Sequence, residues 1–121
     1  MIDAGFAAQF AGEWIAAWNA RDLGRILSHY AEEIEFHSPG VARVTGRPDA
    51  FVRGKANLSD YWAKAIAAQP SLHFELERVL VGSDALTILY RNHRAQAVAE
   101  TCAFNDAGEV VYSLACYGPA E

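Results

Sequence analysis

The spacing of apolar residues changes along this 121-residue chain, and no other feature of the sequence constrains the fold as strongly. Near the N-terminus, large aromatic residues recur at every fourth position: Phe6, Phe10, Trp14 and Trp18. That period gives one apolar face to an α-helix. From Glu33 onward, apolar and polar residues alternate, as they do in half-buried strands. Helices followed by a run of antiparallel strands predict an α+β fold with the helices on one face of a curved sheet.

Three helices are expected in the N-terminal half of the chain. The first follows the N-cap Asp3 and ends at Asn19, and a shorter second helix follows Asp22. The third spans about residues 54–69, where apolar residues again share one helical face. Between the second and third helices, the sequence VARV at 41–44 predicts a short strand.

The other strands are predicted from alternation and from turn residues. A strand that starts near Glu33 ends at Pro39-Gly40, because this pair favours a turn. The remaining strands are expected at 72–82, 85–91, 95–104 and 109–118. The Gly-Ser-Asp sequence at 82–84 predicts a hairpin between two of them.

Composition limits the partners and the compartment. The formal net charge of −5 argues against nucleic acid or an anionic membrane as the main partner, since both attract clustered Lys and Arg. The N-terminal residues lack the basic start and apolar run of a signal peptide, so a cytoplasmic location is expected. Cys102 and Cys116 do not have the spacing of metal ligands, and two buried, reduced thiols are expected. Neither a metal nor a cofactor is expected.

Three segments carry a resemblance to a known superfamily. They are WIAAWNARDLGRILSHYAEEIEFHSPG at 14–40, GKANLSDYWAKAI at 54–66 and FNDAGEVVYSLACY at 104–117. Together they resemble the nuclear transport factor 2-like superfamily, and most of all its SnoaL-like and ketosteroid-isomerase-like small proteins. The resemblance implies one pocket domain over residues 1–121, with the cystatin-like fold. In that fold three N-terminal helices pack on a strongly curved antiparallel sheet to form a cone-shaped barrel, usually as a homodimer through the sheet.

The resemblance also identifies positions that are functional in ketosteroid isomerases. Those enzymes use an aspartate base before a proline on the first strand, a tyrosine on the first helix and a protonated aspartate near the last turn. Ser38, Trp14 and Glu100 take these positions here. A serine hydroxyl without a partner is not a general base near neutral pH, and an indole N–H donates a hydrogen bond without passing on a proton. Classical steroid isomerisation is therefore not expected.

Glu100 is the retained carboxyl and the first candidate catalytic residue. It shares one face of its predicted strand with Cys102 and Phe104. If those two residues point inward, Glu100 does too, and its carboxyl should resist ionisation. The alternative is that Glu100 lies at the surface and pairs with Arg91 or Arg94.

His37 is the second candidate catalytic residue. On a regular strand it points away from the face of Phe36 and Ser38, and hence outward. A β-bulge before Pro39 would turn it into the interior, where it would form an acid/base pair with Glu100. The sequence does not show whether the two side chains meet.

A curved sheet over helices leaves a wedge that can hold a ligand. The residues predicted to line this pocket are Trp14, Trp18, Tyr30, Phe36, Ser38, Trp62, Cys102 and Phe104. The alternative is that the aromatic members of this set fill a solid core.

Three functions remain open at this stage. The chain binds a small, mostly apolar molecule, or it is a cofactor-independent isomerase, cyclase or hydratase that uses Glu100, alone or with His37, for proton transfer. It is otherwise an accessory subunit that acts through the outer face of its sheet. The expected homodimer depends on outward apolar side chains of the strands, namely Val79, Val81, Val111 and Tyr117.

Overall fold

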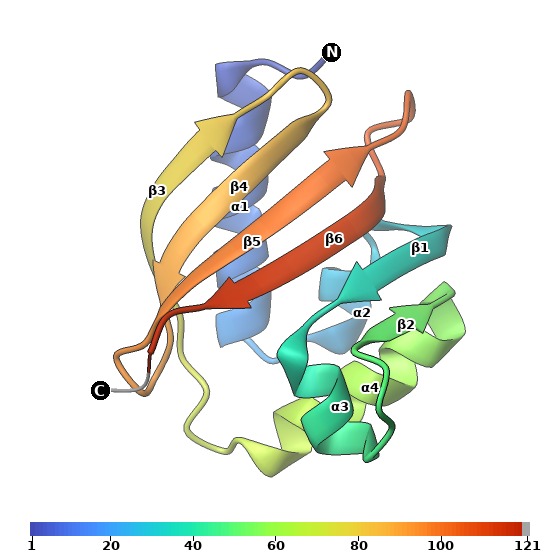
Figure 1. Cartoon of the computed structure of the whole chain (residues 1–121). Helices are drawn as coiled ribbons and strands as arrows, with labels where there is room; N and C mark the ends of the chain where they lie inside the picture. Colours follow the sequence, from blue (N-terminus) through green and yellow to red (C-terminus); the bar gives the residue numbers. More distant parts are fainter. Residues whose placement is uncertain (120–121) are drawn as a thin grey trace.

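The order of the long helices and strands is the one that the change of period predicts, and the structure adds a helix and a short strand between residues 39 and 53. The computed structural model describes residues 1–119, which form a mixed α+β fold (Figure 1). The helices are α1 (Ala4–Asn19), α2 (Leu23–Leu27), α3 (Pro39–Thr45) and α4 (Lys55–Ala68). The strands are β1 (Tyr30–His37), β2 (Phe51–Arg53), β3 (Glu75–Val81), β4 (Ala85–Arg91), β5 (Ala97–Phe104) and β6 (Val110–Tyr117). The α+β prediction is confirmed.

Local capping fixes the first two helices as predicted. The Asp3 carboxylate accepts a hydrogen bond from the Phe6 backbone N–H at 2.8 Å, and Asp22 accepts one from Arg25 at 3.1 Å. Each bond satisfies an N–H that has no partner within its helix. The aromatic face of α1 is then buried behind the sheet, with Trp14 only 2 % exposed.

The predicted strand at 41–44 is wrong, because these residues lie in the helix α3. The Ser38 Oγ accepts a hydrogen bond from the Gly40 N–H at 3.2 Å, and Pro39 occupies the first helical turn. Gly46, at a φ of 75°, ends the helix in the left-handed conformation that glycine tolerates. These start and stop signals outweigh the strand preference of the valines.

The six strands form one sheet in the order β2-β1-β6-β5-β4-β3. The pairing is antiparallel except between β1 and β6, which are parallel, so the expectation of a wholly antiparallel sheet is wrong. Strand direction depends here on a long-range pairing between the two ends of the chain, and no local pattern specifies it. The inner face of this sheet carries Tyr90, Glu100 and Cys102 towards the helices.

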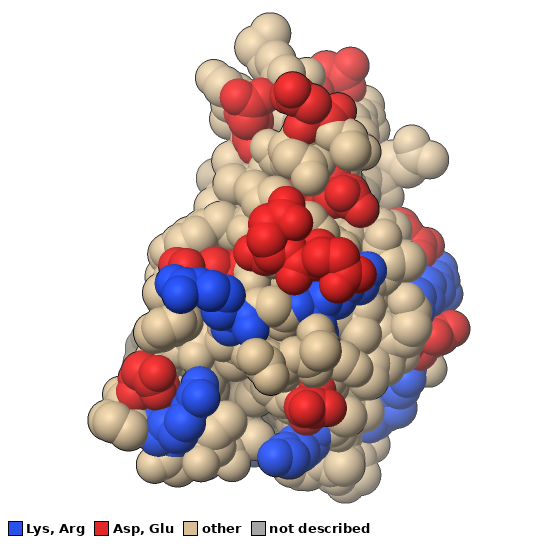
Figure 2. All heavy atoms as spheres, turned by 90° about the vertical axis from the view of Figure 1, so that its right-hand side faces the viewer, with Lys and Arg blue, Asp and Glu red and all other residues tan. Residues whose placement is uncertain are grey.

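Charged groups on the surface are mixed in sign. On the face shown in Figure 2, acidic side chains gather at the upper end, and lower down Lys and Arg lie beside acidic groups. Ion pairs such as Arg25–Glu13 at 2.6 Å and Arg53–Glu35 at 2.8 Å join such neighbours. In the described part of the chain, no helix has the length and apolarity to cross a lipid bilayer.

The outer face of the sheet differs from the predicted set of residues. Val79 packs against the core and Tyr117 lines an inner pocket, so neither points outward as expected. Exposed apolar positions of this face include Leu80 on β3 and Tyr112 and Leu114 on β6, which are 49 %, 39 % and 38 % exposed. Cys116 is exposed next to them rather than buried, so the expectation of two buried thiols is right only for Cys102.

We expect this outer face to form the homodimer. A Leu114→Asp change should shift the chain to monomer, because it places a charge on the outer face of the sheet. Sedimentation velocity at micromolar concentration measures the shift. Gln9→Asp, an equal change of charge on the exposed side of α1, is the control and should leave the dimer intact. A wild-type chain that sediments only as monomer contradicts the expectation.

Candidate functional site

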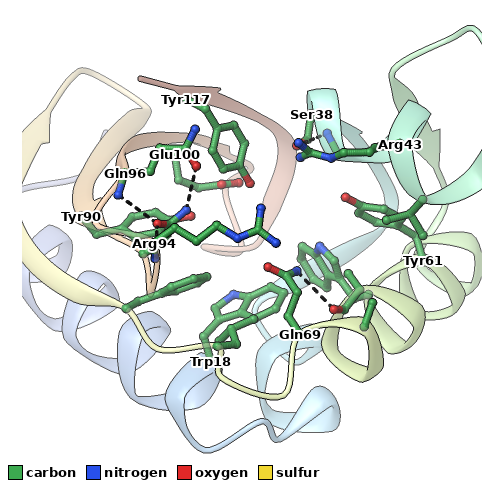
Figure 3. A pocket seen from close by; sticks show the side chains of 18 of the residues that line it. Trp18, Ser38, Arg43, Tyr61, Gln69, Tyr90, Arg94, Gln96, Glu100 and Tyr117 are labelled. Atoms are coloured by element: carbon green, nitrogen blue, oxygen red, sulfur yellow. Dashed lines mark hydrogen bonds between the residues drawn. The ribbon is translucent and has the colours of Figure 1, made fainter. Parts of the chain in front are cut away.

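A pocket of about 270 Å³ lies between the inner face of the sheet and the helices α1, α3 and α4 (Figure 3). Its walls come from segments far apart in sequence. The residues that shape it most are Trp14, Trp18, Phe36, Ser38, Tyr61, Trp62, Phe74, Tyr90, Glu100 and Tyr117. Its volume is near the lower end of the roughly 300–1,000 Å³ that ligand pockets span.

Aromatic rings form one wall of the pocket. The Trp18 and Trp62 rings meet edge to face with centroids 5.0 Å apart, and the Phe74 and Tyr90 centroids are 4.4 Å apart. Trp14 touches this group through Tyr90 at 5.3 Å. Rings at these separations hold one another in place, so the wall offers a preformed apolar surface.

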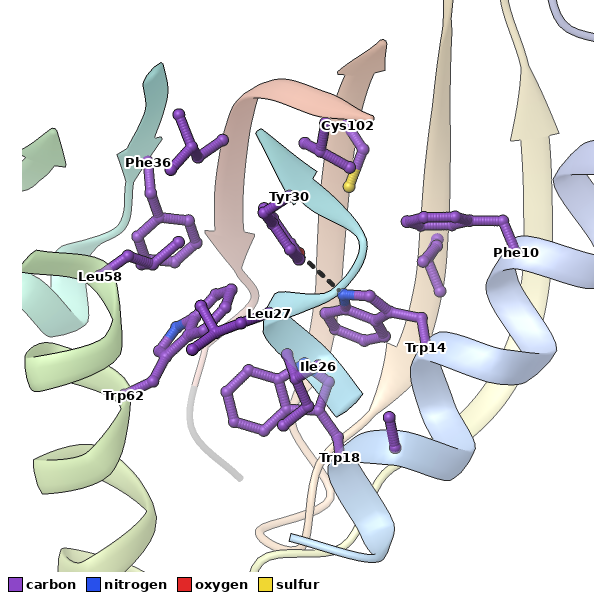
Figure 4. Close-up of a cluster of buried hydrophobic side chains, with 14 of the residues drawn as sticks. Phe10, Trp14, Trp18, Ile26, Leu27, Tyr30, Phe36, Leu58, Trp62 and Cys102 are labelled. Atoms are coloured by element: carbon purple, nitrogen blue, oxygen red, sulfur yellow. Dashed lines mark hydrogen bonds between the residues drawn. The ribbon is translucent and has the colours of Figure 1, made fainter. Parts of the chain in front are cut away.

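Three residues predicted to line the pocket lie in the filled core behind it (Figure 4). Tyr30 is fully buried, and its hydroxyl accepts a hydrogen bond from the Trp14 indole at 3.0 Å. Cys102 is also fully buried, and Phe104 packs edge to face on Phe10. They face inward as predicted, but they lie further along β1 and β5, where the barrel is filled.

His37 faces the outer side of the sheet, and the predicted acid/base pair with Glu100 is not formed. Its Nε2 lies 2.7 Å from the Glu35 carboxylate, and its ring stacks on Phe51 with centroids 5.2 Å apart. From Glu35 to His37 the pairing of β1 with β2 and β6 is regular, so no bulge turns the side chain inward. Hydrogen bonds from His37 and Arg53 lower the pKa of Glu35.

Glu100 is at the pocket and is only 3 % exposed. It lies on β5 opposite Ile88 of β4 and Ala115 of β6. The Ser113 hydroxyl donates a hydrogen bond of 2.5 Å to one of its carboxylate oxygens. The alternative of a surface ion pair is wrong, because Arg91 approaches Glu77 instead.

Burial raises the pKa of Glu100 to about 7, against the lowering effect of the Ser113 hydrogen bond. Its carboxyl is therefore divided between the protonated and ionised forms near neutral pH. Burial also raises the pKa of Tyr90 well above its usual value of 10, so the phenol beside it stays protonated. A protonated Glu100 can donate a hydrogen bond or a proton to a bound molecule, and the ionised form can accept one.

Four polar side chains form a corner at the mouth of the pocket. Of these, the sequence predicted only Ser38 as a pocket residue. The corner consists of Ser38, Arg43, Tyr61 and Tyr117 (Figure 3). A Cβ added at Gly40 would lie 2.6 Å from the Tyr61 hydroxyl and 3.5 Å from both the Arg43 guanidinium and Ser38 Oγ, so these groups converge on one spot. Burial raises the pKa of Tyr61 to about 12.

Some of these residues could have been found from the sequence. Tyr117 alternates with Ser113 and Ala115 and therefore lies on the same inner face of β6. An irregularity in the strand near Val110 makes this alternation difficult to recognise from the sequence. Arg43 follows from recognising Ser38-Pro39 as the start of a helix. Arg94 lies in the turn between β4 and β5, and no sequence pattern aims a turn residue at a pocket.

Two further observations bear on ligands. The buried indole N–H of Trp18 has no hydrogen-bond acceptor among the described residues. A buried donor of this kind calls for a partner, such as a water molecule or a ligand. Within residues 1–119, no group of three His, Cys, Asp or Glu side chains lies close enough to hold a metal ion.

The fold and the pocket together define a class: small α+β proteins in which helices and a curved sheet enclose a pocket. The model of the SnoaL-like domain matches residues 11–112, and the chain belongs to this family. The comparison with curated proteins gives no match.

Solved structures agree with this assignment. A SnoaL-like protein of unknown function from Burkholderia thailandensis is 42 % identical over 98 % of both chains, with a TM-score of 0.93. A protein of unknown function with a cystatin-like fold from Methylobium petroleophilum is 14 % identical, with a TM-score of 0.76 over 99 % of this chain and 80 % of that one. A candidate ketosteroid isomerase from Kribbella flavida is 12 % identical, with a TM-score of 0.74 over 97 % and 81 %. The last two show the fold alone, which the description of the Methylobium protein gives as cystatin-like, so the predicted fold is confirmed.

The raised pKa of Glu100 predicts that stability falls as pH rises. Between pH 4.5 and 7 the folded chain keeps a proton on Glu100 that the unfolded chain has lost, so the free energy of unfolding decreases with pH. The total loss is on the order of 3 kcal/mol and is complete above pH 7. Urea unfolding of wild type and Glu100→Gln at pH 5 and pH 8 measures it.

The glutamine variant removes the ionisable group and should lose this pH dependence. Glu32→Gln, an exposed position on β1, serves as the control and should behave as wild type. If wild type and Glu100→Gln lose equal stability between pH 5 and pH 8, the raised pKa is contradicted.

Proposed function

We propose that this protein binds a small, mostly apolar molecule in the pocket, with Glu100 as its polar anchor. One observation supports this most directly: the Glu100 carboxyl is buried at an aromatic pocket, and this burial raises its pKa to about 7. Such a group costs stability, and a site that keeps it is a candidate for binding or catalysis.

The chemistry of the pocket indicates how a ligand would be held. Rings such as Trp18, Trp62 and Phe74 offer dispersion and apolar contact to the body of the molecule. A protonated Glu100 donates a hydrogen bond to a carbonyl or hydroxyl oxygen of the ligand. Its own orientation is fixed by Ser113, so little freedom is lost on binding.

A second candidate function is proton transfer without a cofactor, in an isomerase, cyclase or hydratase. The favouring observation is that the pKa of Glu100, at about 7, is close to ambient pH, where one group serves best as both donor and acceptor. His37 is not available as its partner because it faces the outer side of the sheet. An accessory role through the outer face is the third candidate, and it depends on the apolar residues of β3 and β6 described above.

Loss of the Glu100 proton donor should weaken ligand binding. Glu100→Met has a similar length but carries no N–H or O–H donor, and we expect affinity to fall about tenfold. Isothermal titration of a panel of small ketones and medium-chain fatty acids measures it at pH 6.5. Glu32→Gln is again the control and should keep wild-type affinity. A panel in which no member binds the wild type contradicts the binding function.

Catalysis is tested separately from binding. If Glu100 transfers protons, a bound ketone should exchange its α-hydrogens with deuterium in D₂O, and NMR follows the exchange. The reaction should slow at least a hundredfold in Glu100→Gln, because the amide does not titrate near neutral pH. Binding without any exchange would leave the protein a binding module and exclude this reaction for the ligands tried.

A further inference from the structure

Two arginines reach the mouth of the pocket from opposite sides. Arg43 comes from α3, and Arg94 comes from the turn between β4 and β5; Figure 3 shows both guanidinium groups turned towards the opening. Neither of them forms an ion pair with a carboxylate of residues 1–119. In contrast, the exposed Arg25 and Arg53 both pair with glutamates elsewhere on the surface.

The segments that carry these arginines are fixed in place. Asn92 Oδ1 accepts hydrogen bonds from the backbone N–H groups of Arg94 at 3.0 Å and Gln96 at 3.1 Å. Ala95 takes a positive φ of 57° to complete this turn. On the other side, the Ser38 cap sets the start of the helix that carries Arg43. Both guanidinium groups therefore extend from ordered backbone, which lowers the entropic cost of using them.

Hydroxyl donors lie beside Arg43. Ser38 and Tyr61 are 2 % and 8 % exposed, and the Tyr117 ring stands at the same corner of the mouth. Because burial raises the pKa of Tyr61 to about 12, its phenol keeps its proton and can donate. A guanidinium with neighbouring hydroxyls is the arrangement that recognises carboxylates by charge-assisted hydrogen bonds.

The charge of the pocket is opposite to that of the whole chain. Its lining holds two arginines, and Glu100 is the one carboxyl among the described lining residues. With Glu100 protonated, the mouth is positive on a chain of formal net charge −5. A positive opening over low-dielectric walls concentrates anions and repels cations.

From these observations we infer that the ligand is a compact amphipathic carboxylic acid. Its apolar body lies against the aromatic wall, and Arg43 and Arg94 hold its carboxylate at the mouth of the pocket. The inference rests on the proposed binding function and adds the chemical class of the ligand. The pocket volume of about 270 Å³ suits an acid with one or two rings or a medium-length chain.

The test compares probes that differ only in charge. The probes are 1-naphthylacetate, its methyl ester and 2-(1-naphthyl)ethylamine, with 4-phenylbutyrate and decanoate and their methyl esters as further pairs. Titration calorimetry at pH 6.5 keeps the acids ionised and most of Glu100 protonated. At low salt we expect each bound acid to exceed its ester in affinity by about tenfold or more, and the amine not to bind. High salt should reduce the difference.

Substitutions of the two arginines test whether they cause the preference for acids over esters. Arg43→Gln and Arg94→Gln should each reduce the acid-to-ester ratio several-fold, and the double variant should bring it close to one. Arg78→Gln on β3 removes the same charge from an exposed position outside the pocket lining and should change nothing. Thermal unfolding of all variants checks that the fold is intact.

The outcomes separate the two proposals. Esters that bind as tightly as the acids, or an acid preference that survives in the double variant, overturn the inference and leave the binding function standing. If no acid and no ester on any of the three scaffolds binds the wild type, the binding function itself fails, and the inference fails with it.

Discussion

The buried contact between Trp14 and Tyr30 decides where the filled interior ends and the pocket begins. The hydrogen bond of 3.0 Å joins α1 to β1, and it satisfies an indole N–H that would otherwise be costly to bury. The same indole packs on Tyr90 from the sheet, so one side chain belongs to both regions. Towards Phe10 and Phe104 the interior is solid, and towards Trp18 and Trp62 it is hollow.

The hollow determines the state of Glu100. Glu100 lies on a regular strand with Ile88 and Ala115 as neighbours, and the burial of its carboxyl favours the protonated form. Ser113 supplies one hydrogen bond and leaves the second oxygen for other partners. The pocket thus combines an aromatic wall, a buried carboxyl and two arginines at its opening.

The sequence predicts the face on which a residue lies better than its depth. Strand parity places Glu100 inside and His37 outside, and both positions are found in the structure. Strand parity does not distinguish Glu100, which lines the pocket, from Cys102, which lies in the core. The two positions differ in how the helices pack over the strand, and this depends on tertiary structure. Likewise, the residues from 38 to 46 depend on capping by Ser38, which the alternation of valines obscured.

The parallel pairing of β1 with β6 has a consequence for biosynthesis. During translation, the segment Tyr30–His37 leaves the ribosome long before its neighbour Val110–Tyr117 exists. Its edge then has only β2 to bond with, and the cone stays open until the last strand arrives. Contacts of such high sequence separation slow folding, and until β6 is synthesised the unpaired edge of β1 can associate with other chains.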